Sequence, residues 1–402
     1  MINLRVFRNK PFQLNRTARP LTQAVLTLLL CVNLFAQDWK TLADGVEHAQ
    51  VRREFSGKNV DINLLRLNLK KVRLDVHHAL DKAIGLETTS SIASRKSAIA
   101  AINGGFFRLD KSAWAGEAVD ILVVDGDLWS ETNGDRIAIR ILNGSAKTEA
   151  WFDRFRTETS VETQSYSTPV SGVNRQRSPD EMVAYTPAFG RSTLTDSLGA
   201  ELIFRSCTGT SLCAVTVIEN GGNSPIPADG FVLSIGPSHP ENTTRLVEWL
   251  KGKVDPFSMR IALSSRLKGR PQFRLTPSDD VTSGLPLLIK NSKIDITWQQ
   301  EKASKLFVET RHPRTAVAKL KDGKFLMLTA DGRSEASAGI DLYDLAKYML
   351  ELGALAAMNL DGGGSTTMFL DGKVVNKPSD KEGERKIGDA IVVTLRKPKK
   401  RS

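Results

Sequence analysis

The chain has 402 residues, of which 41% are hydrophobic and 25% are charged. This composition is that of a globular protein that can bury a sizeable core without disulfide staples, and it excludes a largely disordered chain. The formal net charge is +11, and it falls to +6 when the five basic residues of the first 36 are left out.

The first 36 residues differ from the rest of the chain. They contain basic residues but no acidic ones, and they end in the apolar run Leu21–Leu34 and the small residue Ala36. This order of basic, apolar and small residues is typical of a signal peptide, and the apolar run is short for a membrane span. We therefore expect a signal peptide at 1–36, export to the periplasm or the medium, and no stable membrane span after cleavage. An uncleaved anchor is the alternative, because Leu34 is a poor residue at the −3 position.

Two further compositional features bear on partners. The basic tail, 397–402, is expected to be a solvated end, although it could touch an anionic polymer or a membrane. None of the six tryptophans lies in a basic and aromatic pattern that would suit nucleic acid, so no nucleic-acid partner is expected.

The first predicted strands lie at 61–69 and 72–77, joined by a two-lysine turn. A short helix is expected at Ser90–Lys96. The apolar run Ser97–Ile102 then predicts a strand that ends in Asn103, Gly104 and Gly105. Two glycines after a strand let the backbone bend sharply or approach a ligand, and a β-bulge is the structural alternative.

The middle of the chain is rich in short strands. Strands are predicted at Val119–Leu128 and Arg136–Leu142, with further strands across 150–235. A helix is expected at Pro240–Leu250 and a buried strand at Leu285–Ile289.

Two cysteines remain if the first 36 residues are removed. Cys207 and Cys213 flank a short loop, and export would place them in an oxidising compartment. We expect a disulfide that pins a hairpin. Two free thiols are the alternative.

Two clusters of polar residues flank a predicted strand at Phe325–Ala330. Upstream, Pro313 fixes the backbone before Arg314 and Thr315, and a guanidinium is suited to phosphate or carboxylate. Downstream, the strand ends in Asp331, Gly332 and Arg333. A plain surface Arg–Asp pair is the alternative for each cluster.

The most informative stretch comes near the C-terminus. Leu342 begins an amphipathic helix, and a buried strand is predicted to follow at Ala354–Met358. The next residues combine an amide, a carboxylate, three glycines and a hydroxyl: Asn359, Asp361, Gly362, Gly363, Gly364 and Ser365. A plain turn is the alternative, but glycine runs after a strand usually mark a backbone that must touch something.

These patterns predict one strand-rich scaffold. The fold class is α+β (mixed α/β), a twisted sheet with a few packing helices and a single catalytic domain. N-terminal strands at 37–94 are expected to pack on a main domain at 95–396. The four polar clusters are expected to meet in one cleft, because loops at strand ends on a rigid scaffold often carry function.

Together, the clusters resemble the phosphodiester glycosidase family. The resemblance rests on Ala101–Phe107, Pro313–Ala316, Asp331–Arg333 and Asn359–Ser365, in that order. Ala318 and the less glycine-rich turn at Ser283–Pro286 depart from the family pattern. The resemblance implies an exported glycoside hydrolase that cleaves a sugar-1-phosphodiester, with exopolysaccharide or cell-wall polymer as the expected substrate.

The resemblance and the residue chemistry together suggest roles. Asp361 and Asp331 are the expected catalytic carboxylates. Arg314 and Arg333 would hold the phosphate, with Thr315 or Ser365 and an anion nest of glycine N–H groups from Gly104–Gly105 or Gly362–Gly364. The amides of Asn103 and Asn359 would orient sugar hydroxyls.

Four alternatives remain open from the sequence. His312 is a further acid or base, although none of the five histidines has zinc-like spacing. No cofactor is expected, but Asp331 and Asp361 could hold Ca²⁺ or Mg²⁺. The same cleft would also serve a non-catalytic binder of sugar-phosphate polymer, or a metal-dependent phosphodiesterase.

Overall fold

The structure is a computed structural model that describes residues 37–162, 167–205, 214–219, 221–239, 258–265 and 274–397. Residues 1–38 and Trp39–Ser402 are two separate units, and the strands and helices from β1 onward all lie in the second. Three expectations fall outside the described residues: the signal peptide at 1–36, the disulfide between Cys207 and Cys213, and the helix at Pro240–Leu250.

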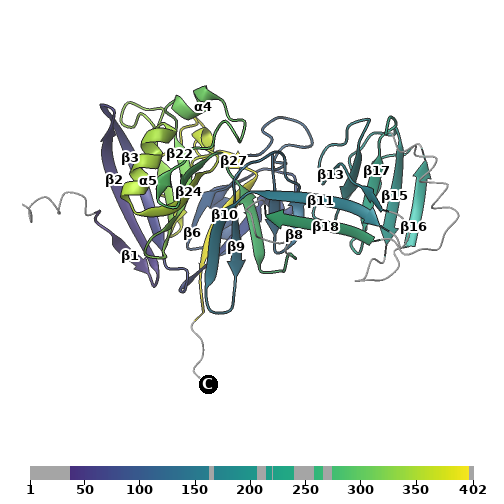
Figure 1. The fold of residues 1–402 in the computed structure, drawn as a ribbon, viewed down its shortest axis with the longest axis horizontal. Coiled ribbons are helices and arrows are strands. Elements are labelled where there is room, and N and C mark those ends of the chain that lie inside the picture. The colour runs from purple at the N-terminus through teal and green to yellow at the C-terminus, as the bar shows by residue number, and fades with distance from the viewer. Residues whose placement is uncertain are drawn as a thin grey trace, which may run out of the picture. The chain divides into compact units, whose positions relative to one another are not determined.

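The largest element is an antiparallel sheet of eight strands, which we call the large sheet. Its strand order is β1-β2-β3-β23-β22-β24-β20-β21 (Figure 1). The strands in that order are Lys40–Ala43, Val46–Phe55, Lys58–Leu67, Phe325–Ala330, Arg314–Leu320, Ala354–Asn359, Leu287–Lys290 and Lys293–Ile294.

A second antiparallel sheet of five strands, the small sheet, has the order β26-β25-β6-β28-β4. Its strands in that order are Lys373–Val374, Met368–Leu370, Ala100–Asn103, Asp389–Leu395 and Val72–His78. A two-stranded ribbon pairs β27 (Lys386–Ile387) with β5 (Glu87–Thr88).

Three more sheets come from the middle of the chain. One has the order β10-β9-β19-β7-β8, with strands Thr148–Asp153, Ala138–Asn143, Asp279–Ser283, Leu122–Val124 and Asp127–Ser130. The next pairs β12 (Ser167–Pro169), β11 (Phe155–Glu162) and β18 (Ser258–Ser265). The last has the order β13-β14-β17-β15-β16, with strands Gly172–Val173, Met182–Tyr185, Phe231–Ile235, Ala200–Arg205 and Ala214–Glu219.

Helices are few in the described residues. They are α2 (Thr89–Arg95), α4 (Lys305–Glu309) and α5 (Leu342–Glu351), with 3₁₀ turns η1 (Ala79–Asp81) and η2 (Gly363–Ser365). α5 begins at Asp341, whose side chain accepts the backbone N–H groups of Tyr343 and Asp344. None of the helices is long and apolar enough to cross a membrane, within the residues described.

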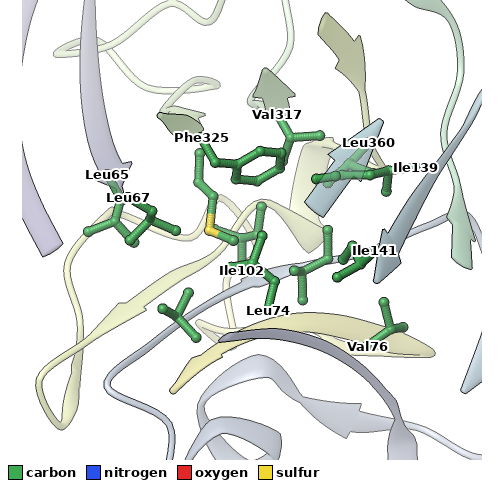
Figure 2. Packing of buried hydrophobic residues seen from close by; sticks show 14 of the residues in the cluster. Leu65, Leu67, Leu74, Val76, Ile102, Ile139, Ile141, Val317, Phe325 and Leu360 are labelled. Atoms are coloured by element: carbon green, nitrogen blue, oxygen red, sulfur yellow. The ribbon is translucent and has the colours of Figure 1, made fainter. Parts of the chain in front are cut away.

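Alternation of side chains along the strands builds two apolar layers on the large sheet. Leu65 and Leu67 of β3 and Val317 of β22 face the small sheet, where they pack with Leu74 and Ile102 (Figure 2). The opposite face of the large sheet packs against α5, through residues such as Leu64, Ala316, Leu345 and Met349. The polar clusters described below extend from strands whose positions are fixed by these layers.

The strand-rich α+β fold predicted from the sequence is confirmed. The two predicted strands before residue 78 are present as β3 and β4, but they do not pair with each other, because β3 lies in the large sheet and β4 in the small sheet. The turn at Lys70–Lys71 therefore carries the chain from one layer to the other. Leu67 and Leu74, on either side of this turn, contribute to the same core.

Truncation of a core residue tests this packing. Leu74→Ala should lower the free energy of unfolding by about 2–5 kcal/mol, because Leu74 is 0% exposed and the truncation leaves a cavity. Leu198→Ala is the control, since Leu198 is 61% exposed and should change the free energy by less than about 0.5 kcal/mol. Equal losses in urea titrations of the two variants would contradict the described core.

Candidate active site

Four polar clusters come together at one end of the two facing sheets. In the large sheet, Arg314 at the start of β22 pairs with Ala330, the last residue of β23, and Asn359 ends the neighbouring strand β24. In the small sheet, Asn103 ends β6. Antiparallel pairing therefore gathers clusters that are far apart in the sequence.

The side chain of Asn103 joins the two sheets. Its Oδ1 accepts hydrogen bonds from Thr315 Oγ1 (2.7 Å) and from the backbone N–H of Thr367 (3.2 Å), and its Nδ2 donates to the carbonyl oxygen of Asp361 (2.7 Å). Asn103 is only 1% exposed. The structure thus brings Asn103, Thr315 and Asp361 together, but it uses the Asn103 amide to hold loops and not to reach a sugar.

Gly104 and Gly105 lie against Asp389, the first residue of β28. The N–H of Gly104 donates to the Asp389 carbonyl (2.8 Å), and the N–H of Gly105 donates to Asp389 Oδ1 (3.0 Å). A Cβ atom at position 104 would lie 2.2 Å from Asp389 Oδ2, so only glycine fits there. Both N–H groups are bound within the protein, and they do not form the anion nest considered from the sequence.

Asp389 is a buried carboxylate that sequence reasoning missed. It also accepts a hydrogen bond from Thr282 Oγ1 (2.8 Å), and it lies near the fully buried His78. Burial raises the pKa of Asp389, against the opposing charge of His78, and burial lowers the pKa of His78. Asp389 therefore fixes the backbone of the loop that carries Asn103 to Gly105.

Asp361 lies at the entrance to the glycine turn. Its carboxylate is half-buried, and Oδ1 accepts the backbone N–H of Gly362 (2.9 Å). Burial raises the pKa of Asp361 to about 6, although Ser365, the Gly362 N–H and the charge of Arg385 act in the opposite direction. This carboxylate changes protonation close to neutral pH.

Two guanidinium groups lie over the glycine turn. A Cβ atom at Gly363 would lie 2.9 Å from Arg333 Nη2, and one at Gly364 would lie 2.2 Å from Arg385 Nη2. Arg333 is exposed, and Arg385 is half-buried and paired with Asp380 (2.7 Å). A side chain at either position would displace these guanidinium groups, so the glycines let the arginines lie close to the turn. Arg385 was not identified from the sequence, because no strand or motif marks it.

Arg314 occupies a different environment from Arg333. It is 1% exposed, and its guanidinium donates to the backbone carbonyls of Phe307 (2.6 Å), Thr310 (2.9 Å) and Ile340 (3.2 Å). Burial lowers its pKa to about 10. Arg314 thus ties α4 and the segment before α5 to β22, an arrangement that favours a positioning role over the predicted contact with phosphate.

Asp331 and Asn359 are also engaged by the protein. The carboxylate oxygens of Asp331 accept hydrogen bonds from Asn376 Nδ2 (3.2 Å) and the N–H of Lys377 (3.0 Å), and burial raises its pKa to about 6. Asn359 is 0% exposed and donates to the carbonyls of Leu285 (2.6 Å) and Leu360 (2.7 Å). These placements favour loop support for both residues, and they leave Asp361, beside the glycine turn, as the remaining predicted catalytic carboxylate.

His312 lies beside the exposed arginine. Its Nδ1 is 3.5 Å from Arg333 Nη2, and burial together with the charges of Arg314 and Arg333 lowers its pKa. His312 is therefore neutral at neutral pH and belongs to the same cluster as Arg333.

A half-buried aromatic pair follows the Gly104–Gly105 loop. The rings of Phe106 and Phe307 are 6.1 Å apart and meet edge to face, with Arg136 5.8 Å from the first ring and Arg314 4.7 Å from the second. Such a pair offers an apolar surface beside the polar loops.

A cavity of about 570 Å³ opens next to the hairpin that follows Phe106. Its lining includes Arg108, Glu117, Glu131 and Arg175. Burial raises the pKa of Glu117 to about 7, and the nearby Glu131 adds to the effect. Glu117 was missed from the sequence because it lies in a short hairpin without a motif. It is a further carboxyl, after Asp361 and Asp331, whose pKa is raised toward neutral pH.

Among the described residues, no group of three or more His, Cys, Asp or Glu side chains is arranged to hold a metal ion. A Ca²⁺ or Mg²⁺ ion held by Asp331 and Asp361, which the sequence left open, stays a prediction.

Comparison with known proteins bears on what this site does. Residues 219–394 match the family model described as phosphodiester glycosidase. The family resemblance predicted from the motifs is confirmed. The matched region contains Asp331, Arg333, Asp361 and the glycine turn, whereas Asn103 to Gly105 precede it.

Two known proteins are similar to part of this chain. The chain is 38% identical over 87 residues to the SPbeta prophage-derived uncharacterized protein YomE of Bacillus subtilis, over 22% of this chain and 13% of that protein. It is 34% identical over 113 residues to the Homo sapiens N-acetylglucosamine-1-phosphodiester alpha-N-acetylglucosaminidase, over 26% of this chain and 22% of the enzyme. The chain thus spans about a fifth or less of the length of these relatives.

The fold has a counterpart among solved structures. A hypothetical protein from Synechocystis matches with a TM-score of 0.70 at 22% sequence identity, over 90% of this chain and 64% of that one. At this identity the match supports the fold alone.

A glycine substitution tests the loop geometry. Gly104→Ala should lower the free energy of unfolding by about 1–3 kcal/mol or more, because its methyl group would collide with the Asp389 carboxylate at 2.2 Å. Gly144→Ala is the control, because its nearest contact would be 3.2 Å, to a carbonyl oxygen. A Gly104→Ala protein as stable as the control in thermal and urea unfolding would rule out the close packing of Gly104 on Asp389.

Proposed function

We propose that this protein is an exported hydrolase that cleaves the glycosidic C–O bond of a sugar-1-phosphodiester. The observation that carries the proposal is Asp361. Its half-buried carboxylate has a pKa raised to about 6, and it lies at a glycine turn covered by Arg333 and Arg385. The family match of residues 219–394 supports the same chemistry.

The proposed reaction has simple requirements. A nucleophile attacks the anomeric carbon, the bond from that carbon to the phosphate oxygen breaks, and the electron pair leaves with the phosphate. The ionised Asp361 either takes a proton from the attacking water or attacks the carbon itself before water completes the hydrolysis. A phosphate monoester is a fair leaving group, so a strong general acid is not required.

The arginines supply the other half of the chemistry. The exposed guanidinium of Arg333 lies over Gly363, close to Asp361 in the chain. It contacts His312 but forms no ion pair among the described residues, so its charge can bind the phosphate. Charge-assisted hydrogen bonds from guanidinium to phosphate oxygens are strong and planar. They would stabilise the charge that develops as the phosphate departs. Arg385, paired with Asp380, adds positive charge on the same side of the turn.

The substrate class and location extend this proposal. The basic and apolar pattern of residues 1–36 supports export, and an exported chain would meet sugar phosphates in exopolysaccharide or cell-wall polymer. A Cys207–Cys213 disulfide would suit that environment.

The first experiment measures release of free sugar from N-acetylglucosamine joined through phosphate to methyl mannoside. We expect turnover by the purified protein, and a loss of at least about 100-fold in Asp361→Asn, because removal of a catalytic carboxylate abolishes its role at the anomeric carbon. Asp371→Asn is the matched control, because Asp371 is an exposed residue in the β25–β26 hairpin turn.

The pH profile provides a second readout of Asp361. The raised pKa means that the ionised form increases as pH rises through about 6, so kcat/KM should rise through that pH and then level off. Unchanged thermal unfolding in Asp361→Asn shows that the loss is chemical.

The same assay separates the competing functions. A parallel reaction in labelled water should place the label in the sugar, because the C–O bond breaks. Label in the phosphate would instead indicate a phosphodiesterase, and a chelator arm shows whether a metal is needed. Tight binding of the substrate without turnover, unaffected by Asp361→Asn, would identify a non-catalytic binder.

Substitution of the exposed arginine tests phosphate recognition. Arg333→Gln should reduce kcat/KM by about 100-fold, because a charged donor to the departing phosphate is lost. Arg191→Gln removes an exposed arginine from another part of the chain and should leave kcat/KM unchanged. Equal activity in the two variants would remove Arg333 from the proposed site.

A further inference from the structure

The end of the sheets opposite the glycine turn is strongly basic. β4 and β28 pair so that His78 faces Asp389 at one end and Val72 faces Leu395 at the other. Seven residues of strand span about 20 Å at 3.3 Å per residue, so this far end lies about 20 Å from the Gly104–Gly105 loop.

Two adjoining cavities line this end. The first has a volume of about 1000 Å³, and the second, which shares Lys70 with it, has a volume of about 480 Å³. We call the two together the basic groove. The cations of the first are Lys70, Lys71, Arg73, Arg396 and Lys397, and the second adds Lys147, Lys319 and Lys324.

The carboxylates of the groove do not balance these charges. Its lining holds eight cations and three acidic residues, Asp44, Glu149 and Asp322. Asp44 pairs with Lys71 (2.8 Å) and Glu149 pairs with Lys147 (3.2 Å).

Acidic residues outside the lining neutralise two more of the cations. Asp75 binds Arg73 (2.9 Å), and Glu47 binds Lys324 (2.8 Å). Even with both of these counted, the groove retains an excess of positive charge.

Four cations in the groove have no carboxylate partner among the described residues. Lys70, Lys319 and Lys397 make no ion pair there. Arg396 donates to the carbonyls of Val72 (3.1 Å) and Gly144 (3.0 Å) and to Thr148 Oγ1 (2.8 Å). Burial and the neighbouring charge of Arg73 lower the pKa of Arg396, so the protein holds like charges close together.

We propose that the basic groove binds an anionic polysaccharide and holds the chain while its phosphodiester is cleaved at the glycine turn. Unbalanced cations in a concave surface concentrate polyanions, and a groove accepts a polymer chain better than a flat bilayer. The inference that this polymer is the substrate rests on the proposed function. The inference that the groove binds the polymer does not rest on it, because the groove is remote from Asp361 and the neighbouring arginines.

The test reverses charge in the groove without touching an ion pair. The variant Lys70→Glu/Lys319→Glu/Lys397→Glu changes three residues that have no carboxylate partner in the described part of the chain. The matched control Lys58→Glu/Lys290→Glu/Lys293→Glu makes the same charge change at exposed lysines outside the groove.

The probe is fluorescently labelled poly(N-acetylglucosamine 1-phosphate), an anionic polysaccharide joined by sugar-1-phosphodiesters, measured by anisotropy at several salt concentrations. We expect the wild type and the control to bind it, and the groove variant to bind at least about tenfold more weakly, with a salt slope smaller by roughly one unit per lost contact. All three proteins should release sugar equally from the small phosphodiester, because that substrate does not reach the groove.

The outcomes separate the two proposals. Equal polymer affinity in all three proteins, or equal losses in both variants, overturns the groove. Tighter binding to phosphatidylglycerol vesicles or to single-stranded RNA than to the polymer also overturns it, because the partner is then of another class. Polymer binding by a wild type that hydrolyses no sugar phosphodiester supports the groove and overturns the proposed function instead.

Discussion

The candidate site depends on one buried amide. Asn103 ends a strand of the small sheet, and its side chain bonds to Thr315 of the large sheet and to the backbone of Asp361. A buried amide that lost these partners would incur a desolvation penalty of about 1–3 kcal/mol, so the two sheets can pack only in the register that satisfies it. That register places Asp361, the glycine turn and Arg333 beside one another, and the chemistry proposed for the protein requires this arrangement.

The sequence reveals the parts of the site that depend on local patterns. The strand ends near Asn103, Asp331 and Asp361 can be recognised in the sequence, because at each of them an apolar run stops and glycine residues follow. The strand-rich fold is predictable for the same reason. Burial, however, is decided by packing between distant segments, so Arg314 and Asn359 resemble ligand-binding residues in sequence although the structure places them inside the protein.

Residues missed from the sequence have a common cause. Asp389 lies within an apolar strand, Arg385 lies in an irregular loop, and Glu117 lies in a short hairpin, so no local pattern distinguishes them. Each acts on a residue from another segment of the chain. Asp389 accepts the N–H of Gly105, Arg385 lies against Gly364, and the charge of Glu131 raises the pKa of Glu117. The segment before residue 78 illustrates the same limit, because the sequence predicts its two strands and their turn but does not indicate that the strands lie in different sheets.

The contact between Gly104 and Asp389 has a consequence for how the chain can vary. Because a methyl group at position 104 would overlap the carboxylate of residue 389, the two positions cannot change independently. A smaller residue at 389 would remove the carboxylate from this contact and leave the backbone carbonyl oxygen at 2.9 Å, but it would also release the N–H of Gly105. Substitutions at these two positions are therefore non-additive, and each amino acid sets which residues are permitted at the other, 285 positions away in the sequence.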